Sequence, residues 1–167
     1  MKALSLKQPY AWLILQRAYE DNPRTVLKPI ENRPRPLPKN FVLPQRVLIH
    51  ASMTLYDVKL SELKDRMTET QWERVRKHII GLYSEYAFYR SDKAKLQATR
   101  DFGCILGSVI ITGQVIESQS PWFFGKFGYT LEFPEMLKEP VPYKGQLGFF
   151  EINVPYGDLL LGGKGEN

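Results

Sequence analysis

Apolar residues recur at strand spacing near the start of this 167-residue chain and again in its last third. Residues 2–6 (KALSL) alternate weakly and predict a short strand, and residues 46–51 (RVLIHA) predict a second one. Between them, residues 11–15 (AWLIL) are apolar on every side, which predicts a buried helix whose first turn contains a proline. Residues 28–33 (KPIENR) predict a short extended segment that leads into the proline-rich run 34–38.

Helical periodicity dominates the middle third of the chain. Residues 57–67 place four apolar side chains near one stripe, and residues 68–83 open with Thr68 and Gln71 at the spacing of a capping box. A shorter helix is expected over residues 92–100. The sequence therefore predicts a group of helices between two β-rich parts of the chain.

Strand patterns return in the last third. Residues 103–117 form the longest of them, with Gly107 and Gly113 as expected bulges or bends, and residues 128–133 and 145–154 follow. Together the elements predict an α+β protein. Its mixed or antiparallel sheet is expected to curve into a small partial β-barrel, with the helices flanking the outside.

Composition and length are typical of one ordinary globular domain. With 43% apolar and 25% charged residues, a chain of this length can bury roughly 70% of its unfolded surface. We expect one domain over residues 1–156 and a flexible tail over residues 157–167. No segment approaches the roughly 18 to 20 consecutive apolar residues of a membrane span, so no membrane partner is expected.

The cysteine content indicates the compartment. Cys104 has no second cysteine to pair with, and its neighbours in GCILGSVII predict a small buried side chain. The apolar stretch 11–15 is too short for the core of a signal peptide. These features predict a cytoplasmic protein.

Positive charge is concentrated near the N-terminus. The net charge is +5, and residues 1–50 carry nine Lys and Arg against three acidic residues. A basic face of this kind favours polyanionic partners through electrostatic steering and release of counterions. Many soluble proteins are equally basic, so charge alone does not separate a nucleic-acid partner from simple solubility.

Several catalytic and cofactor chemistries find no support in the sequence. The two histidines, His50 in a strand pattern and His78 in a helix, have no companion at metal-ligand spacing. The glycine-rich dinucleotide and phosphate loops and the GxSxG motif are also absent from the sequence. We therefore expect no metal and no cofactor, and we interpret His50 as a hydrogen-bonded strand histidine.

Three charged side chains are expected to meet beside the first helix. Residues two apart on a strand share a face, so Glu31 and Arg33 should point together, with Lys28 entering the same region. The helix start at Pro9 offers unpaired N–H groups for a phosphate or carbonyl oxygen, and Tyr10 can present a flat face there. On spacing alone, the alternative is a surface salt bridge between Glu31 and Arg33 with Tyr10 in the core.

The same segments resemble a known family. The chain resembles the activating-signal-cointegrator homology (ASCH) family over residues 5–152. Five segments carry the resemblance, in the family's order: SLKQPYAWLIL, KPIENR, RVLIHAS, GCILGSVIITGQV and PVPYKGQLGFFEI. With tyrosine in place of the family's tryptophan, its Ser-x-x-Gln-Pro-Trp-Ala pattern falls on Ser5, Gln8, Pro9, Tyr10 and Ala11. Its Lys-x-x-Glu-x-Arg pattern falls on Lys28, Glu31 and Arg33.

The resemblance implies a PUA-like β-barrel with flanking helices that binds nucleic acid. RNA, single-stranded or carrying a modified nucleotide, is the expected partner, with DNA as the alternative. The implied contacts are phosphate binding by Lys28, Arg33 and Lys144, base stacking by Tyr10 and Trp122, and base-edge hydrogen bonds from Gln8, Glu31 and Asn32. Ser5 and Pro9 complete the implied site beside the helix.

Three alternatives to binding remain open at this point. Some small bacterial relatives hydrolyse an acyl amide on a modified cytidine, which would make Lys28 catalytic, with Glu31 at the position of a hydroxyl residue. A ribonuclease is the second alternative. The third is a protein-interaction module that docks through residues 34–38 (PRPLP). Two departures from the family pattern, the longer loop YEDNPRTV and the proline-rich run, lie on the expected rim of the cleft and affect which substrate fits.

Overall fold

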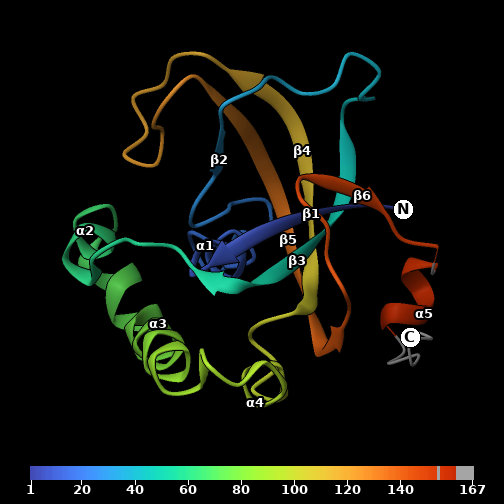
Figure 1. Cartoon of the computed structure of the whole chain (residues 1–167). Helices are drawn as coiled ribbons and strands as arrows, with labels where there is room; N and C mark the ends of the chain where they lie inside the picture. Colours follow the sequence, from blue (N-terminus) through green and yellow to red (C-terminus); the bar gives the residue numbers. More distant parts are fainter. Residues whose placement is uncertain (154, 161–167) are drawn as a thin grey trace.

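The computed structural model describes residues 1–153 and 155–160, and its centre is one six-stranded sheet (Figure 1). The strands are β1 (Lys2–Gln8), β2 (Ile30–Arg33), β3 (Gln45–Leu55), β4 (Cys104–Val115), β5 (Phe127–Pro142) and β6 (Phe149–Glu151). They lie in the order β2-β5-β4-β3-β1-β6; β1 and β3 run parallel, whereas the other neighbours are antiparallel. The prediction of an α+β protein with a mixed sheet is confirmed.

The sheet is strongly curved but open (Figure 1). Among the described residues, β2 and β6 stand at the two ends of the strand order and do not pair with each other. The predicted barrel is therefore not closed. Closure needs edge strands long enough to meet at a consistent tilt and stagger, and here the two edge strands have only four and three residues.

Two glycines bend β4 as the sequence predicted. The register with β5 shifts between Ile105 and Gly107 and again between Ile111 and Gly113. At Gly107 an added Cβ would overlap the backbone carbonyl oxygen of Glu135, so this close approach of two strands requires glycine. The irregularities let β4 and β5 curve together around the core.

The helices are α1 (Tyr10–Leu13), α2 (Leu60–Asp65), α3 (Glu69–Tyr89), α4 (Lys93–Ala98) and α5 (Tyr156–Leu160). Helices α2, α3, α4 and α5 lie on the outside of the sheet, whereas α1 lies at the centre of the view and contributes Ala11 to the core formed by the strands (Figure 1). In Figure 1, α2, α3 and α4 follow one another along one side, while α5 lies on the other side near the N-terminus. Within the described ranges, no helix combines the length and the apolar character needed to cross a bilayer.

The capping box that starts α3 is confirmed. The Thr68 hydroxyl oxygen accepts from the Gln71 backbone N–H at 3.1 Å, and the Gln71 side-chain oxygen accepts from the Thr68 N–H at 3.0 Å. The helix continues to Tyr89, six residues beyond the predicted range 68–83. Its buried face, which includes Ile79, packs against α1 and α2, and this packing extends the helix past the sequence signal.

The first residues of the tail predicted over residues 157–167 are helical. Residues 156–160 form α5, and Leu159 is buried in a cluster with Ala3, Leu48 and Ile105. The apolar contact with the sheet holds this turn in place. Residues 161–167 of the predicted tail lie outside the described residues.

Two side chains noted in the sequence serve the core. Cys104 is fully buried, and burial raises the pKa of its thiol to about 11, so the prediction of a small buried side chain is confirmed. His50 is hydrogen-bonded on both ring nitrogens, to the Ser5 hydroxyl at 3.0 Å and the Tyr143 carbonyl at 2.7 Å. The interpretation of His50 as a satisfied strand histidine is also confirmed.

The proline-rich run 34–38 is attached to the sheet. Leu37 is buried, and its N–H donates to the side chain of Gln114 at 2.8 Å. The carbonyl of Arg35 accepts from the hydroxyl of Tyr129 at 3.1 Å. These contacts are those of a rigid connector between β2 and β3.

Candidate functional site

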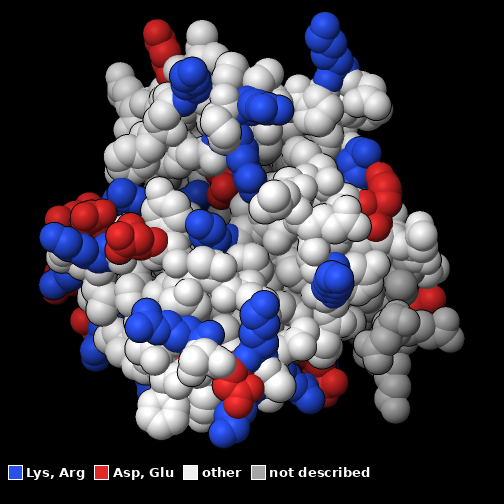
Figure 2. Space-filling view, viewed as in Figure 1, with Lys and Arg blue, Asp and Glu red and all other residues white. Residues whose placement is uncertain are grey.

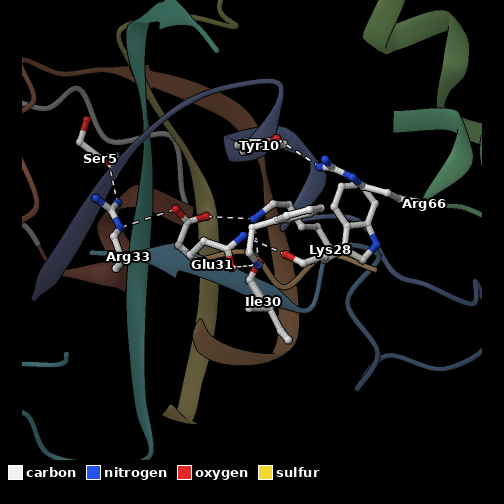
Figure 3. A network of polar contacts seen from close by, with 10 residues as sticks. Ser5, Tyr10, Lys28, Ile30, Glu31, Arg33 and Arg66 are labelled. Carbon is white, nitrogen blue, oxygen red and sulfur yellow. Dashed lines mark hydrogen bonds and ion pairs between the residues drawn. The ribbon is translucent and has the colours of Figure 1, made fainter. Parts of the chain in front are cut away.

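Lys28 is buried at the entrance to β2. Its ammonium nitrogen donates to the Ile30 carbonyl at 2.6 Å and to a carboxylate oxygen of Glu31 at 3.1 Å (Figure 3). The residue is only 1% exposed. Burial lowers the pKa of Lys28 below its usual value, and the Glu31 carboxylate opposes part of that shift. The structure thus holds a lysine amine that is easier to deprotonate than an exposed one.

Glu31 and Arg33 lie on the same face of β2, as their spacing predicted. One carboxylate oxygen of Glu31 is 3.5 Å from the Arg33 Nε, while the other bonds Lys28 (Figure 3). The Arg33 guanidinium also donates to the Ser5 carbonyl at 3.2 Å, which ties β2 to β1. The Glu31–Arg33 ion pair of the alternative interpretation is present, but its side chains are 8% and 23% exposed, so it is partly buried and not a surface salt bridge.

Tyr10 covers the Lys28 amine. The Lys28 nitrogen lies 4.6 Å from the centroid of the Tyr10 ring, and the ring of Tyr56 packs beside it at 5.0 Å. The Tyr10 hydroxyl accepts a hydrogen bond from Arg66 at 3.3 Å (Figure 3). Desolvation raises the pKa of that hydroxyl, so it remains protonated at neutral pH.

These residues line one cleft of about 680 Å³, which we call the β2 cleft. Of the residues predicted from the sequence it contains Ser5, Tyr10, Lys28, Glu31, Asn32 and Arg33. Its volume is within the range of pockets that hold small organic ligands. Lys28, Glu31 and Arg33, which the sequence predicted to meet beside the first helix, do lie together in this cleft.

Gln8 and Pro9 lie behind the cleft. Gln8 is fully buried: its amide donates to the Asp101 carbonyl at 2.7 Å, and its oxygen accepts from the Trp12 N–H at 3.0 Å. The prediction that Gln8 reads a base edge is wrong, because both ends of its amide are used. Gln8 instead caps α1, and with four residues that helix is too short for the expected anion receptor.

Asn32 has a structural task as well. Its amide donates to the Trp122 carbonyl at 2.8 Å, and its oxygen accepts from the Phe124 N–H at 2.8 Å. Trp122 is 3% exposed and packs in the core with Leu13 and Leu27, so the prediction that it stacks a base is wrong. Two residues further on, Phe124 is 52% exposed and lines the β2 cleft.

Lys144 lies in a neighbouring cleft. This second cleft, which we call the α4 cleft, has a volume of about 790 Å³, and Lys144, Lys93 and His50 are among its lining residues. The expected contribution of Lys144 to the site beside the first helix is therefore not seen, because Lys144 lines the α4 cleft and not the β2 cleft.

Sequence reasoning missed the aromatic and cationic residues Tyr56, Arg66 and Phe124 of the β2 cleft, among others of its lining. Arg66 ends α2, and its guanidinium carbon lies 4.3 Å from the centroid of the Phe124 ring. Tyr56 follows β3 and is 45% exposed. An exposed aromatic after a strand, or an arginine at a helix end, has no distinctive sequence pattern. Arg66 and Phe124 come from distant segments, so only the fold brings them together.

Among the described residues, no three histidine, cysteine, aspartate or glutamate side chains are placed to hold a metal ion. Comparisons with known proteins give no further direction. No protein-family model matches this sequence, and no curated protein matches it either. The function has to be argued from the cleft itself.

Proposed function

We propose that the β2 cleft binds an unpaired nucleotide of a single-stranded nucleic acid, with RNA as the preferred partner. The observation that carries this proposal is that exposed aromatic rings and cationic side chains line the same cleft. Tyr56 and Phe124 offer flat apolar faces, and Arg33 and Arg66 offer guanidinium groups. Stacking on aromatic rings combined with phosphate contacts is the usual way in which proteins hold unpaired bases.

Arg66 is the proposed phosphate ligand. Its guanidinium is oriented by the Tyr10 hydroxyl and lies over the ring of Phe124, so few conformations are lost when it binds an anion. Arg33 is fixed in a similar way by Glu31 and Ser5. Two guanidinium groups held in place favour a phosphodiester over a diffuse negative charge.

Polar groups in the cleft wall can read the edge of the base. The Ser52 hydroxyl is buried in the cleft wall and has no hydrogen-bond partner among the described residues. A buried hydroxyl without a partner is costly, and rotation of this side chain toward the cleft would let a base edge satisfy it. Glu31, whose oxygens already contact Lys28 and Arg33, retains lone pairs for an exocyclic amino group.

This proposal includes a PUA-like fold of the ASCH family. Its support is that the two segments carrying the resemblance, QPYA and KPIENR, contribute Tyr10, Lys28, Glu31 and Arg33 to one cleft. The curved six-stranded sheet with outer helices is compatible with an opened form of such a barrel.

Binding to short single-stranded oligonucleotides tests the proposal. Tyr56→Ala should weaken binding by about 1 to 3 kcal/mol because it removes a stacking face. Arg66→Ala should weaken binding and lower the salt slope of log K by about 0.7, the value for one phosphate contact on a single strand. Fluorescence anisotropy with RNA and DNA of the same sequence measures both effects. It also measures the preference of the protein for RNA or DNA.

Matched variants outside the cleft serve as controls. Phe88→Ala removes an aromatic ring that is 79% exposed on α3, and Arg76→Ala removes an exposed arginine from the same helix. Both variants should bind like the wild type. Loss of affinity in the controls equal to that in Tyr56→Ala and Arg66→Ala would overturn the assignment to the β2 cleft.

A second candidate is hydrolysis of an acyl amide on a cytidine-type nucleoside, which the buried Lys28 favours. Its amine has a lowered pKa and lies in the cleft wall. A neutral amine can accept a proton from water as the water attacks the acyl carbonyl. The ammonium formed on Lys28 then returns the proton to the departing nitrogen as the carbon–nitrogen bond breaks, which releases a carboxylic acid and the free amino group of the base.

Turnover of an N4-acylated cytidine separates the two candidates. If the protein is this hydrolase, the wild type should consume the nucleoside. Lys28→Met, a variant that keeps the apolar stem of the side chain, should not. Chromatography of the products measures the reaction. Without turnover by the wild type, the hydrolase candidate is excluded and the binding proposal stands.

A further inference from the structure

We propose that the α4 cleft is a second subsite that holds the neighbouring nucleotides of the same strand. A single-stranded nucleic acid would then pass from the β2 cleft over Leu147 into the α4 cleft, with its backbone between Lys93 and Lys144. This inference rests on the proposed function and extends it from one nucleotide to a path for the strand.

The two clefts adjoin each other. Ser5, Ser52 and Leu147 line both of them, so no other element separates the two volumes of about 680 and 790 Å³. Each volume suits a ligand of the size of one or two nucleotides. A strand that leaves the first cleft over these shared residues enters the second directly.

The loop between the clefts is anchored at its base. The Nε2–H of His50 donates to the Tyr143 carbonyl at 2.7 Å, and the ring packs against Gly145 so closely that an added Cβ would overlap it. Burial lowers the pKa of His50, so the imidazole beneath the loop is neutral at pH 7. These contacts hold the loop that ends at Leu147 in place between the two subsites.

Leu147 lies on this loop and lines both clefts. Its side chain is fully exposed, at 100%, although it is a large apolar residue. Exposed apolar side chains that project between two ligand sites can rest against the flat face of a base. The position of Leu147 on both clefts fits a contact with the base that crosses from one subsite to the other.

The charges of the two clefts differ in a way that suits this path. The β2 cleft contains Glu31, Asp57 and Glu62 beside its cations, whereas the described lining of the α4 cleft includes Lys93 and Lys144 and no acidic residue. On the side of the molecule drawn in Figure 2, basic side chains lie across the middle and most acidic ones nearer the margins. The α4 cleft therefore favours further phosphate groups of the backbone, whereas the β2 cleft can hold a base together with its own phosphate.

Comparison of a mononucleotide with an oligonucleotide tests the path. The probes are uridine monophosphate and a labelled uridine octamer, each titrated into the full chain at several salt concentrations. The double variant Lys93→Glu/Lys144→Glu should bind the mononucleotide like the wild type. It should bind the octamer at least tenfold more weakly and lower its salt slope by about 1.4, which corresponds to two phosphate contacts on a single strand.

The matched control is Lys77→Glu/Lys138→Glu, which changes the same charge at two exposed lysines outside both clefts. Its octamer affinity should exceed that of the cleft double variant at every salt concentration. Equal losses in the two double variants would show a nonspecific charge effect and overturn the second subsite. All four lysines are exposed, and thermal melts check that both variants remain folded.

Failure of this inference differs from failure of the proposed function. If Tyr56→Ala and Arg66→Ala weaken octamer binding but the Lys93→Glu/Lys144→Glu variant matches its control, the strand does not enter the α4 cleft and the single-nucleotide site stands. If neither probe binds the wild type at low salt, the proposed function fails, and the second subsite fails with it.

Discussion

Among single residues, the burial of Lys28 beside Glu31 sets the chemistry of the β2 cleft. Removal of an ammonium group from water favours its neutral form, while the adjacent carboxylate favours the charged form. Burial is the larger effect, so the pKa of Lys28 lies below the 10.5 of an ordinary lysine. Among the neighbouring side chains, Glu31 raises the pKa of Lys28, whereas Arg33 and Arg66 lower it.

Glu31→Gln should lower the pKa of Lys28 further. The substitution removes the carboxylate that stabilises the charged amine and leaves the burial unchanged. A side-chain NMR titration of the lysines should show the Lys28 inflection at a lower pH than in the wild type. Glu139→Gln, at an exposed position on β5, should leave that inflection in place. An upward shift in Glu31→Gln would contradict the proposed electrostatics.

At the scale of elements, local patterns predicted where strands and helices lie but not how far the sheet closes. The spacing of Glu31 and Arg33 was sufficient to place them together, because the two-residue period of a strand is a local property. Trp122 and Phe124 are both aromatic residues in one loop, and only the packing of that loop on Asn32 buries the first and exposes the second. Closure of the barrel depends on contacts between distant edges, which no local pattern reports.

Gly107 and Gly113 allow a matched test of the bends in β4. At Gly107 an added methyl group would collide with the backbone of β5, whereas at Gly113 its nearest neighbour is the Thr130 hydroxyl at an ordinary 3.4 Å. Gly107→Ala should therefore cost more than about 2 kcal/mol of unfolding free energy, and Gly113→Ala roughly 1 kcal/mol or less. Urea denaturation of the two variants gives both values. Equal costs would show that the close strand approach at Gly107 does not limit stability.

At the scale of the whole molecule, two carboxyl groups and a histidine connect α3 with the segment that leads into β4. Glu85 on α3 lies beside Asp101, which precedes β4 and is 3.5 Å from the Nε2 atom of His78. Burial and the neighbouring Asp101 carboxylate raise the pKa of Glu85 to about 7. The folded protein therefore holds a proton on Glu85 that the unfolded chain releases near its ordinary pKa of 4.5.

Stability should fall between pH 4.5 and about 7 because of Glu85. In that window the folded state binds more protons than the unfolded state, so the contribution of Glu85 is full below pH 4.5 and is lost as the pH rises through 7. Glu85→Gln should remove this part of the decline, whereas Glu73→Gln on the exposed face of α3 should retain it. Urea denaturation across this range measures the effect, and parallel curves for Glu85→Gln and the wild type would rule out the elevated pKa.

The pairing of β1 with β6 has a consequence during synthesis of the chain. Lys2, Ala3 and Leu4 bond on one side to residues 149–151, which are made almost 150 residues later. Until that segment leaves the ribosome, β1 can pair with β3 but keeps a row of unpaired N–H and C=O groups beside apolar side chains. A nascent or truncated chain that ends before Phe149 therefore exposes the edge of β1 at Lys2–Leu4 to pairing with other chains, and in the folded protein the three residues of β6 cover that edge.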